Sequence, residues 1–197
     1  MALKTMVKVG KISNLSDARY CAGMSVDMLG FRVIPGHEHY VTPELFKEIR
    51  GWFSGPTVVA ELYGIQKGED LPTIIQNYLP DLFELTIQDL TKLHSPSSSY
   101  ILATTYEEVI AQESVIAPYR NQLAFILVPA TTEKAKLDEL IKGFKVLLDI
   151  TTEDSMSAYF EHPGVKGIAL EGGSEDKPGL KNYDKLSAIL EKLEVED

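Results

Sequence analysis

The sequence is poor in cysteine, in long apolar runs and in basic residues. Cys21 is the only cysteine, so neither an intramolecular disulfide nor a cysteine metal cluster can form. No stretch approaches the roughly 20 apolar residues of a membrane-spanning helix, and residues 1–10 lack the apolar core of a signal peptide. The 19 Lys and Arg face 29 Asp and Glu, a formal net charge of -10, which repels nucleic acid and anionic lipid. We therefore expect a cytoplasmic protein with no nucleic-acid or membrane partner.

The remaining composition is that of a soluble globular protein. Hydrophobic residues make up 44% of the 197 residues and charged residues 24%. A chain of this length buries about 70% of its unfolded surface in one domain and needs no metal to hold a core. We expect residues 1–197 to form a single domain. A small anionic or sugar-phosphate ligand stays compatible with the net charge, because one site can differ in sign from the whole surface.

Short apolar runs alternate with amphipathic segments along the whole chain. The short runs are typical of parallel strands buried on both faces, and a helix candidate follows each one. The expected strands are Met6–Val9, Met28–Phe31, Thr57–Leu62, Leu82–Leu85, Tyr100–Thr104, Leu123–Val128, Lys145–Asp149 and Gly167–Leu170. The expected helices are Ser16–Met24, Pro43–Arg50, Leu71–Tyr78, Gln88–Leu93, Glu107–Ala117, Thr132–Lys142, Glu153–Glu161 and Tyr183–Leu193.

Eight strand–helix units predict a compact α/β domain, the (β/α)8 TIM barrel. An open doubly wound sheet is the alternative. It usually carries a glycine-rich turn after the first strand, whereas the turn Gly10–Asn14 has one glycine and no dinucleotide fingerprint.

Charged residues recur where the expected strands end, which is where barrels of this kind build their sites. They are Lys8, Lys11, Arg32, Glu61, Glu84, Asp149 and Glu171. Such a group is consistent with acid–base or ligand-binding chemistry. It is equally consistent with an internal ion network that fills the barrel mouth without a ligand.

Two further motifs are weaker. Gly172-Gly173-Ser174 follows the eighth strand, where backbone amides often bind phosphate, although a tight turn that needs glycine explains the pair as well. His37-Glu38-His39 has alternating ligand types, but a solvated loop explains it better, and we expect no metal.

Two stretches resemble the phosphoribosylanthranilate isomerase family. The first is Lys8-Val9-Gly10-Lys11-Ile12-Ser13-Asn14-Leu15-Ser16-Asp17-Ala18, which is similar to the family pattern K-I-C-G-I-T-N-x-x-D-A. The similarity continues through Ala22-Gly23, Asp27–Phe31, Pro35 and Tyr40–Glu44. The second is Gly172-Gly173 with Pro178-Gly179-Leu180-Lys181, which is similar to S-S-G-V-E-x-x-P-G-x-K-D. From Glu61 to Phe144 only the alternation of strands and helices matches.

The resemblance implies a (β/α)8 fold and a cofactor-free Amadori rearrangement of N-(5-phosphoribosyl)anthranilate in tryptophan biosynthesis. In that family a cysteine ending the first strand takes the C2 proton, and a carboxylic acid ending the sixth strand helps to open the sugar ring. These positions fall on Gly10 and near Pro129 in this chain. A general acid or base is each worth roughly 10²–10⁴ in rate, so losing both removes most of the chemical advantage.

The resemblance assigns tentative roles to the residues at the mouth. Lys11, Asp149 or Glu84 would replace the lost acid and base; Gly172, Gly173 and Ser174 would bind phosphate; and Lys8, Arg32, His39 and Glu171 would contact substrate. The first functional hypothesis is a divergent isomerase, monomeric or homodimeric. The second is a non-catalytic relative that binds a small metabolite or a partner protein at the altered mouth. A third is another proton abstraction, which requires Lys8 or Lys11 to have a lowered pKa.

Overall fold

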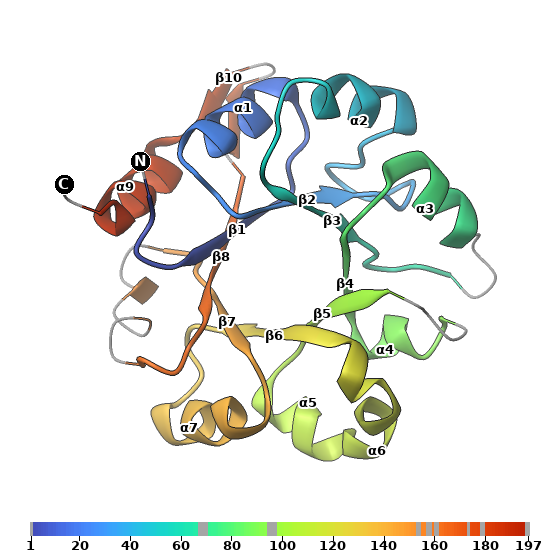
Figure 1. Ribbon diagram of the computed structural model, residues 1–197, viewed down its shortest axis with the longest axis vertical. Helices are drawn as coiled ribbons and strands as arrows, with labels where there is room; N and C mark the ends of the chain where they lie inside the picture. The colour runs from blue at the N-terminus through green and yellow to red at the C-terminus, as the bar shows by residue number, and fades with distance from the viewer. Residues whose placement is uncertain are drawn as a thin grey trace.

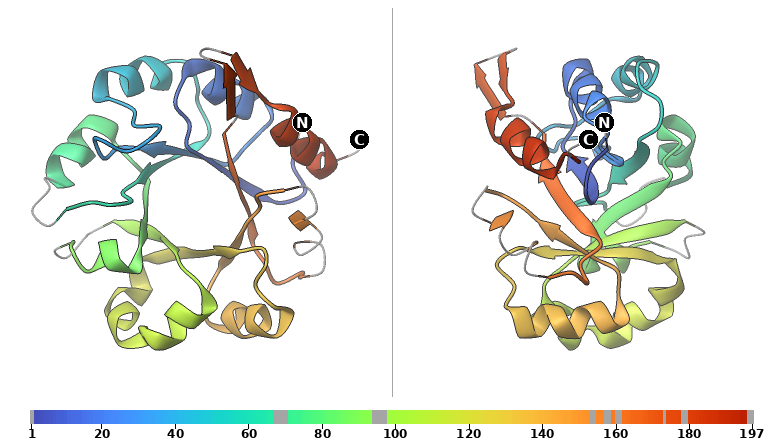
Figure 2. Two further views of the ribbon diagram at one scale, coloured as in Figure 1. Left: turned by 180° about the vertical axis from the view of Figure 1, so that it is seen from behind. Right: turned by 60° about the vertical axis from the view of Figure 1, so that its left-hand side comes forward.

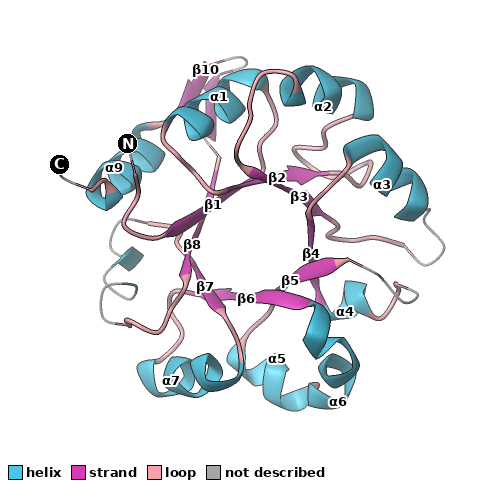
Figure 3. Ribbon diagram, viewed as in Figure 1, coloured by secondary structure: helices cyan, strands magenta, loops and turns pink. Residues whose placement is uncertain are grey.

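The chain folds into a closed barrel of eight parallel strands in sequence order, with its helices arranged outside (Figures 1 and 3). The computed structural model describes residues 2–66, 71–93, 98–152, 155–156, 159, 162–172, 174–177 and 180–195. The barrel strands are β1 (Met6–Gly10), β2 (Met28–Arg32), β3 (Thr57–Glu61), β4 (Leu82–Thr86), β5 (Ser99–Ala103), β6 (Leu123–Pro129), β7 (Val146–Asp149) and β8 (Gly167–Glu171). β1 pairs with β8 over five residues, from Met6 beside Gly167 to Gly10 beside Glu171, and this pairing closes the barrel. The predicted fold class is confirmed.

The described helices follow the strands in the expected alternation. They are α1 (Leu15–Gly23), α2 (Pro43–Arg50), α3 (Leu71–Tyr78), α4 (Ile87–Leu90), α5 (Tyr106–Ala111), α6 (Glu113–Ile116), the 3-10 helix η1 (Ala117–Gln122), α7 (Lys134–Gly143) and α9 (Asp184–Leu193). None of the helices in the described part of the chain is long and apolar enough to cross a bilayer. The helix expected at Glu153–Glu161 lies mostly outside the described residues.

Local chemistry explains where these helices begin and end. Thr42 caps α2 by accepting the amide of Leu45 at 3.3 Å, as its Thr-Pro-Glu start predicts. α1 begins a residue earlier than expected because the Asn14 side chain accepts the amide of Asp17. The expected helix Glu107–Ala117 is broken into α5 and α6 and continues as η1, whose first turn holds Pro118.

A two-stranded hairpin follows β8, where the sequence predicts only a glycine-rich loop. It consists of β9 (Ser174–Lys177) and β10 (Leu180–Asn182), which pair antiparallel. Figure 2 shows it projecting from the barrel next to α9. The N-terminal residues run beside the end of α9, where Leu3 forms an antiparallel bridge with Glu194.

The apolar residues form two separate cores. The larger one packs the outward faces of the strands against the helices. The smaller one fills the barrel with inward-facing residues, namely Met28, Val59, Ile101, Leu127, Leu147 and Ala169, with Met6, Leu82, Ala103 and Phe125 against them. Toward the carboxyl ends of β1, β3 and β4 the interior becomes polar. Lys8, Glu61 and Glu84 point into it there and are each only 2% exposed. This polar layer lies below the barrel mouth.

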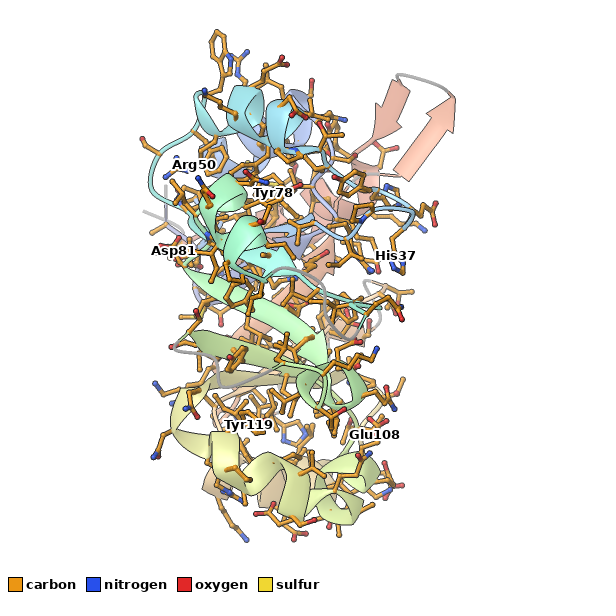
Figure 4. The ribbon with its side chains drawn as sticks, turned by 90° about the vertical axis from the view of Figure 1, so that its right-hand side faces the viewer. His37, Arg50, Tyr78, Asp81, Glu108 and Tyr119 are labelled. Carbon is orange, nitrogen blue, oxygen red and sulfur yellow. The ribbon has the colours of Figure 1, made fainter. Side chains whose placement is uncertain are left out.

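Figure 4 distinguishes the two ends of the barrel. His37 and Glu108 lie at the edge formed by the carboxyl ends of the strands, which we call the mouth. Arg50 and Asp81 lie at the opposite edge, where the strands begin, which we call the base.

Candidate functional site

A buried ion cluster occupies the centre of the mouth. Lys8 Nζ lies 2.8 Å from Glu61 Oε1 and 2.9 Å from Glu84 Oε2. Arg32 Nε lies 3.0 Å from Glu61 Oε2. Tyr63 donates its hydroxyl to Glu84 Oε1 at 2.6 Å, and the Arg32 guanidinium lies 4.4 Å from the centre of the Tyr63 ring. We call these five residues the mouth cluster.

Strand register brings the acids of the mouth cluster together. Arg32, Glu61 and Glu84 end or nearly end their strands, and Arg32 pairs with Glu61 across β2–β3, as Glu61 does with Glu84 across β3–β4. Adjacent residues on parallel strands face the same side of the sheet. The ion network considered as an alternative to a ligand site is therefore present.

Charges within the cluster decide its protonation. Burial by itself raises the pKa of Glu61, but the charges of Lys8 and Arg32 outweigh it and hold that pKa below its ordinary value. Burial likewise acts to lower the pKa of Lys8, yet Glu61 and Glu84 raise it above its ordinary value. Lys8 is thus held as a cation, so Lys8 does not supply the lowered lysine pKa that the third hypothesis requires at Lys8 or Lys11. Burial, with the charge of Glu61, raises the pKa of Glu84 against the opposing charge of Lys8.

The mouth cluster occupies the space beside two glycines. A Cβ atom placed on Gly10 would lie 2.5 Å from Glu61 Oε1 and 2.9 Å from Lys8 Nζ. One on Gly30 would lie 2.3 Å from the same Glu61 oxygen. Real Cβ atoms do not approach so closely, so any side chain at Gly10 requires Glu61 to move. Gly10 is the position onto which the sequence resemblance places the family's cysteine, and a side chain there would displace Glu61 and Lys8.

The loop after β1 keeps a glycine-like backbone without a glycine. Lys11 has φ = +55°, a left-handed conformation that favours glycine, and it stands where the family pattern has glycine. Its Nζ lies 2.5 Å from Glu171 Oε1 on β8. The ion pair therefore ties the ends of β1 and β8 together across the rim.

The predicted phosphate site has different partners in the structure. The Gly172 amide donates to the Gly10 carbonyl at 2.8 Å, so it is not directed at a ligand. Gly173 lies outside the described residues, and Ser174 begins β9 opposite Asn182. Phosphate binding at these three residues stays a prediction.

Two adjoining cavities open at the mouth. The first, about 60 Å³, lies on the mouth cluster and is also lined by Lys11, Asp149 and Glu171. Six predicted site residues therefore come together here: Lys8, Lys11, Arg32, Glu84, Asp149 and Glu171. His39 lines neither cavity; it has φ = +62°, and its Nε2 lies 3.5 Å from Glu38 Oε1.

The second cavity, about 260 Å³, lies over the ends of β5, β6 and β7. It contains Thr104, Thr105, Glu108 and Pro129 and shares Tyr63 and Asp149 with the first. Glu108 accepts the Thr104 hydroxyl at 3.2 Å and completes a capping box with Thr105 at the start of α5. Burial, and secondly the charge of Glu171, raise the pKa of Asp149. We call this cavity the acidic pocket.

Sequence reasoning missed the far wall of the acidic pocket. Thr105 and Glu108 carry a signal, the Thr-x-x-Glu capping box, but that signal indicates a helix start and not a ligand site. Tyr63 follows β3 by two residues and carries no motif. No three His, Cys, Asp or Glu side chains in the described part of the chain lie close enough to hold a metal ion.

A closed barrel of eight parallel strands with helices outside it defines the class as a (β/α)8 barrel, and solved structures share this fold along nearly the whole chain. Phosphoribosylanthranilate isomerase from Thermus thermophilus has a TM-score of 0.71 and 20% identity, covering 95% of this chain and 98% of its own. A monomeric form of the dimeric enzyme from Thermotoga maritima has a TM-score of 0.72 and 18% identity, covering 96% and 98%. A phosphoribosylanthranilate isomerase in complex with reduced 1-(o-carboxyphenylamino)-1-deoxyribulose 5-phosphate has a TM-score of 0.68 and 18% identity, covering 95% and 97%. No protein-family model and no curated protein sequence matches the chain. The chain has the phosphoribosylanthranilate isomerase fold along nearly its whole length.

Proposed function

We propose that this protein is a phosphoribosylanthranilate isomerase-like barrel that binds a small polar ligand at its mouth and does not catalyse the isomerase reaction. The observation that carries the proposal is the position of Glu61 Oε1, which fills the space of a side chain on Gly10. Without a side chain there, the end of β1 offers no base for a C2 proton. Pro129, at the end of β6, offers no acid.

The acidic pocket sets the class of ligand. Each of the three cations lining the two mouth cavities, Lys8, Lys11 and Arg32, already has a carboxylate within 3.0 Å. Asp149 remains to contact a ligand in the larger cavity, whereas Glu108 and the hydroxyls of Thr104 and Thr105 already bond to one another. These groups favour hydroxyl and amine groups over phosphate, because a second anion beside a partly buried carboxylate is repelled. A volume of about 260 Å³ suits a ligand the size of a monosaccharide.

A second candidate is the isomerase itself, with its acid moved to the next strand. Asp149 is the register partner of Pro129 across β6–β7, so its carboxyl lies one strand away from the family's acid position. Its pKa is raised by burial, which suits a general acid. Among the described residues no comparable replacement for the base is free, since Lys11 is paired with Glu171, Lys8 with two carboxylates, and Glu84 with Lys8 and the Tyr63 hydroxyl.

The isomerase assay decides between these two candidates. Freshly prepared phosphoribosylanthranilate is followed by its fluorescence with wild-type protein, with Asp149→Asn, with Lys11→Ala and with no protein. We expect all four rates to be equal. Turnover by wild-type protein that falls in Asp149→Asn would establish the second candidate and overturn the first.

Ligand binding is tested separately by thermal denaturation with millimolar glucosamine and with ribose 5-phosphate. We expect glucosamine to raise the Tm of wild-type protein but not that of Asp149→Asn, because the carboxylate is its partner. Equal shifts in both proteins, or no shift in either, would contradict binding in the acidic pocket.

A further inference from the structure

The base of the barrel contains a cavity that the proposed function does not use. It has a volume of about 430 Å³ and lies where β6, β7 and β8 begin. Its charged lining consists of Arg120, Lys142, Lys145 and Lys166, and its aromatic lining of Phe125 and Phe144. We call it the basal cavity. Ligand-sized pockets in proteins fall in the range of about 300–1,000 Å³, so a small molecule fits.

The basal cavity concentrates positive charge in an acidic protein. Arg120 Nη2 lies 2.8 Å from Glu113 Oε1, and within the described residues it is the one cation of the cavity with a carboxylate partner. Lys142, Lys145 and Lys166 have no carboxylate within 4.0 Å anywhere in the described part of the chain. Clustered like charges repel one another, and an anion between them removes that repulsion.

Different elements bring these cations together. Arg120 comes from η1, Lys142 from the last turn of α7, Lys145 from the residue before β7, and Lys166 from the residue before β8. Lys145 and Lys166 are neighbours because the Lys166 amide donates to the Val146 carbonyl at 2.8 Å. Adjacent barrel strands therefore fix two of the ammonium-bearing residues on rigid backbone.

Aromatic rings form the apolar part of the same cavity. The Arg120 guanidinium lies 4.6 Å from the centre of the Phe144 ring, which holds its charge beside the cavity. Phe125 packs against the core inside the barrel and is only partly buried. The adjoining cavity on the other side of Phe125, about 520 Å³, has Asp27 as its charged residue and no cation among the residues that line it. Of these two adjoining cavities, the basal cavity is the one lined by cations.

We propose that the basal cavity binds a small phosphate monoester that carries an aromatic or similarly flat ring. A phosphate monoester is close to a dianion at neutral pH and presents three acceptor oxygens, which match three unpaired ammonium groups. A single carboxylate would balance only one of them. The ring would lie against Phe125 and Phe144 and replace water on their exposed faces.

The test uses the full chain and phenyl phosphate as the probe, followed by calorimetry and by NMR line broadening of the probe. The variant Lys145→Gln/Lys166→Gln removes two ammonium groups of the basal cavity. The matched control Lys47→Gln/Lys185→Gln removes two exposed lysines on α2 and α9, so both proteins change net charge equally. Benzoate and inorganic phosphate, titrated into wild-type protein, separate the contributions of the phosphate and the ring.

We expect phenyl phosphate to bind wild-type protein, and the basal variant to bind it about tenfold more weakly, as for the loss of two charged contacts. The control should stay within about twofold of wild type, and higher salt should weaken binding of wild-type protein. Asp149→Asn should bind as wild type does, which keeps this result independent of the mouth. If the double variant does not fold by circular dichroism, the single variants are compared with Lys47→Gln, and each should bind about threefold more weakly.

Three results would overturn the proposal. Wild-type protein that binds no phenyl phosphate at millimolar concentration has no such site. If the basal variant and the control lose affinity for phenyl phosphate equally, the attraction comes from the overall charge of the protein and not from a site in the basal cavity. Benzoate or inorganic phosphate bound as tightly as phenyl phosphate would show that the cavity does not select a phosphate joined to a ring.

Discussion

The two ends of this barrel treat their cations in opposite ways. At the mouth, Lys8 is 2% exposed and has a carboxylate on each of two neighbouring strands. At the base, Lys142, Lys145 and Lys166 are exposed and have no carboxylate partner among the described residues. Both groups include residues on or directly before barrel strands, Lys8 in β1 and Lys145 and Lys166 just before β7 and β8, so position along a strand does not explain the difference.

Burial explains it. A charge removed from water is strongly destabilising unless it is paired, whereas an exposed ammonium keeps its hydration and needs no partner. The mouth cluster is therefore self-contained, and its charges are satisfied before any ligand arrives. The base has cations that an anion can still reach. In this barrel the paired charges of the mouth cluster are therefore weaker support for a ligand site than the lysines of the basal cavity, which have no carboxylate partner among the described residues.

Removing the Glu61 carboxylate should have the largest effect on stability. Cations at the mouth would then lack a carboxylate partner, as the lysines at the base do, but they would still be buried. Glu61→Gln leaves Arg32 without its carboxylate and Lys8 with one partner of two. We expect a loss of about 3–5 kcal/mol in the free energy of unfolding, measured by urea denaturation. Glu171→Gln, which removes a more exposed ion pair at the rim, should cost less than about 1 kcal/mol. Equal losses would show that burial does not set the difference.

Restoring a side chain at Gly10 should have the next largest effect. Gly10→Cys forces Glu61 and Lys8 to shift, and we expect a loss of about 1–3 kcal/mol, typical of an overpacked interior. Gly23→Cys is the matched control, since a Cβ there meets no atom within 4 Å. In the double variant with Glu61→Gly the cost of the cysteine should fall by about 1 kcal/mol or more. Additive losses would mean that Glu61 does not block the position.

A smaller effect on stability is expected from Asp149, a partly buried acid at the mouth that has no cation within 4.0 Å in the described part of the chain. Its pKa is raised in the folded state, so the folded protein binds more protons, and its stability falls as pH rises through that pKa. Asp149→Asn should therefore be the more stable protein at pH 7, by less than about 1 kcal/mol because the site is partly exposed. The gap should close below about pH 4, where the carboxyl of the unfolded chain is also protonated. Urea denaturation midpoints measured across pH give this stability difference, with Glu48→Gln as an exposed control. A difference that widens at low pH would mean that the pKa of Asp149 is lowered in the folded protein and would contradict the prediction.

The smallest effect is expected at the base. Lys145→Gln removes one of several neighbouring like charges, so unfolding free energy at low salt should rise by about 0.3 kcal/mol. The gain should vanish in high salt, which screens exposed charges. Lys47→Gln, away from the cavity, should show no salt-dependent gain. A loss of stability in Lys145→Gln would mean that this lysine already has a favourable partner.

Much of the fold follows from the sequence, because each barrel strand is a short apolar run between helix signals. The exceptions are local: the helix after β5 is interrupted at Gln112, which has non-helical backbone angles, and α4 is a single turn capped by Thr86. The hairpin β9–β10 was not predicted, since Ser174–Lys177 is polar and charged and has no apolar alternation.

The site follows from the sequence only in part. Strand ends correctly indicate which charged residues meet at the mouth, because parallel register aligns them. The pairing of Lys8 with Glu61, 53 positions apart, depends on which side chains face inward, and the list of strand ends does not give it. The cations of the basal cavity were missed because their four segments meet only once the barrel closes, at the end opposite to where sites were sought.

The position of Glu61 also determines the order in which this barrel could change. Its carboxylate stands 2.5 Å from the place of a Cβ on Gly10 and 2.3 Å from one on Gly30, so a larger residue at either glycine displaces Glu61. A mutational path toward a cysteine at the end of β1 that begins at Gly10 therefore passes through a destabilised intermediate, and one that begins with a smaller residue at position 61 avoids it. Two orders of substitution that reach the same sequence are therefore unequal, and a library built for laboratory evolution of this chain should randomise position 61 before position 10.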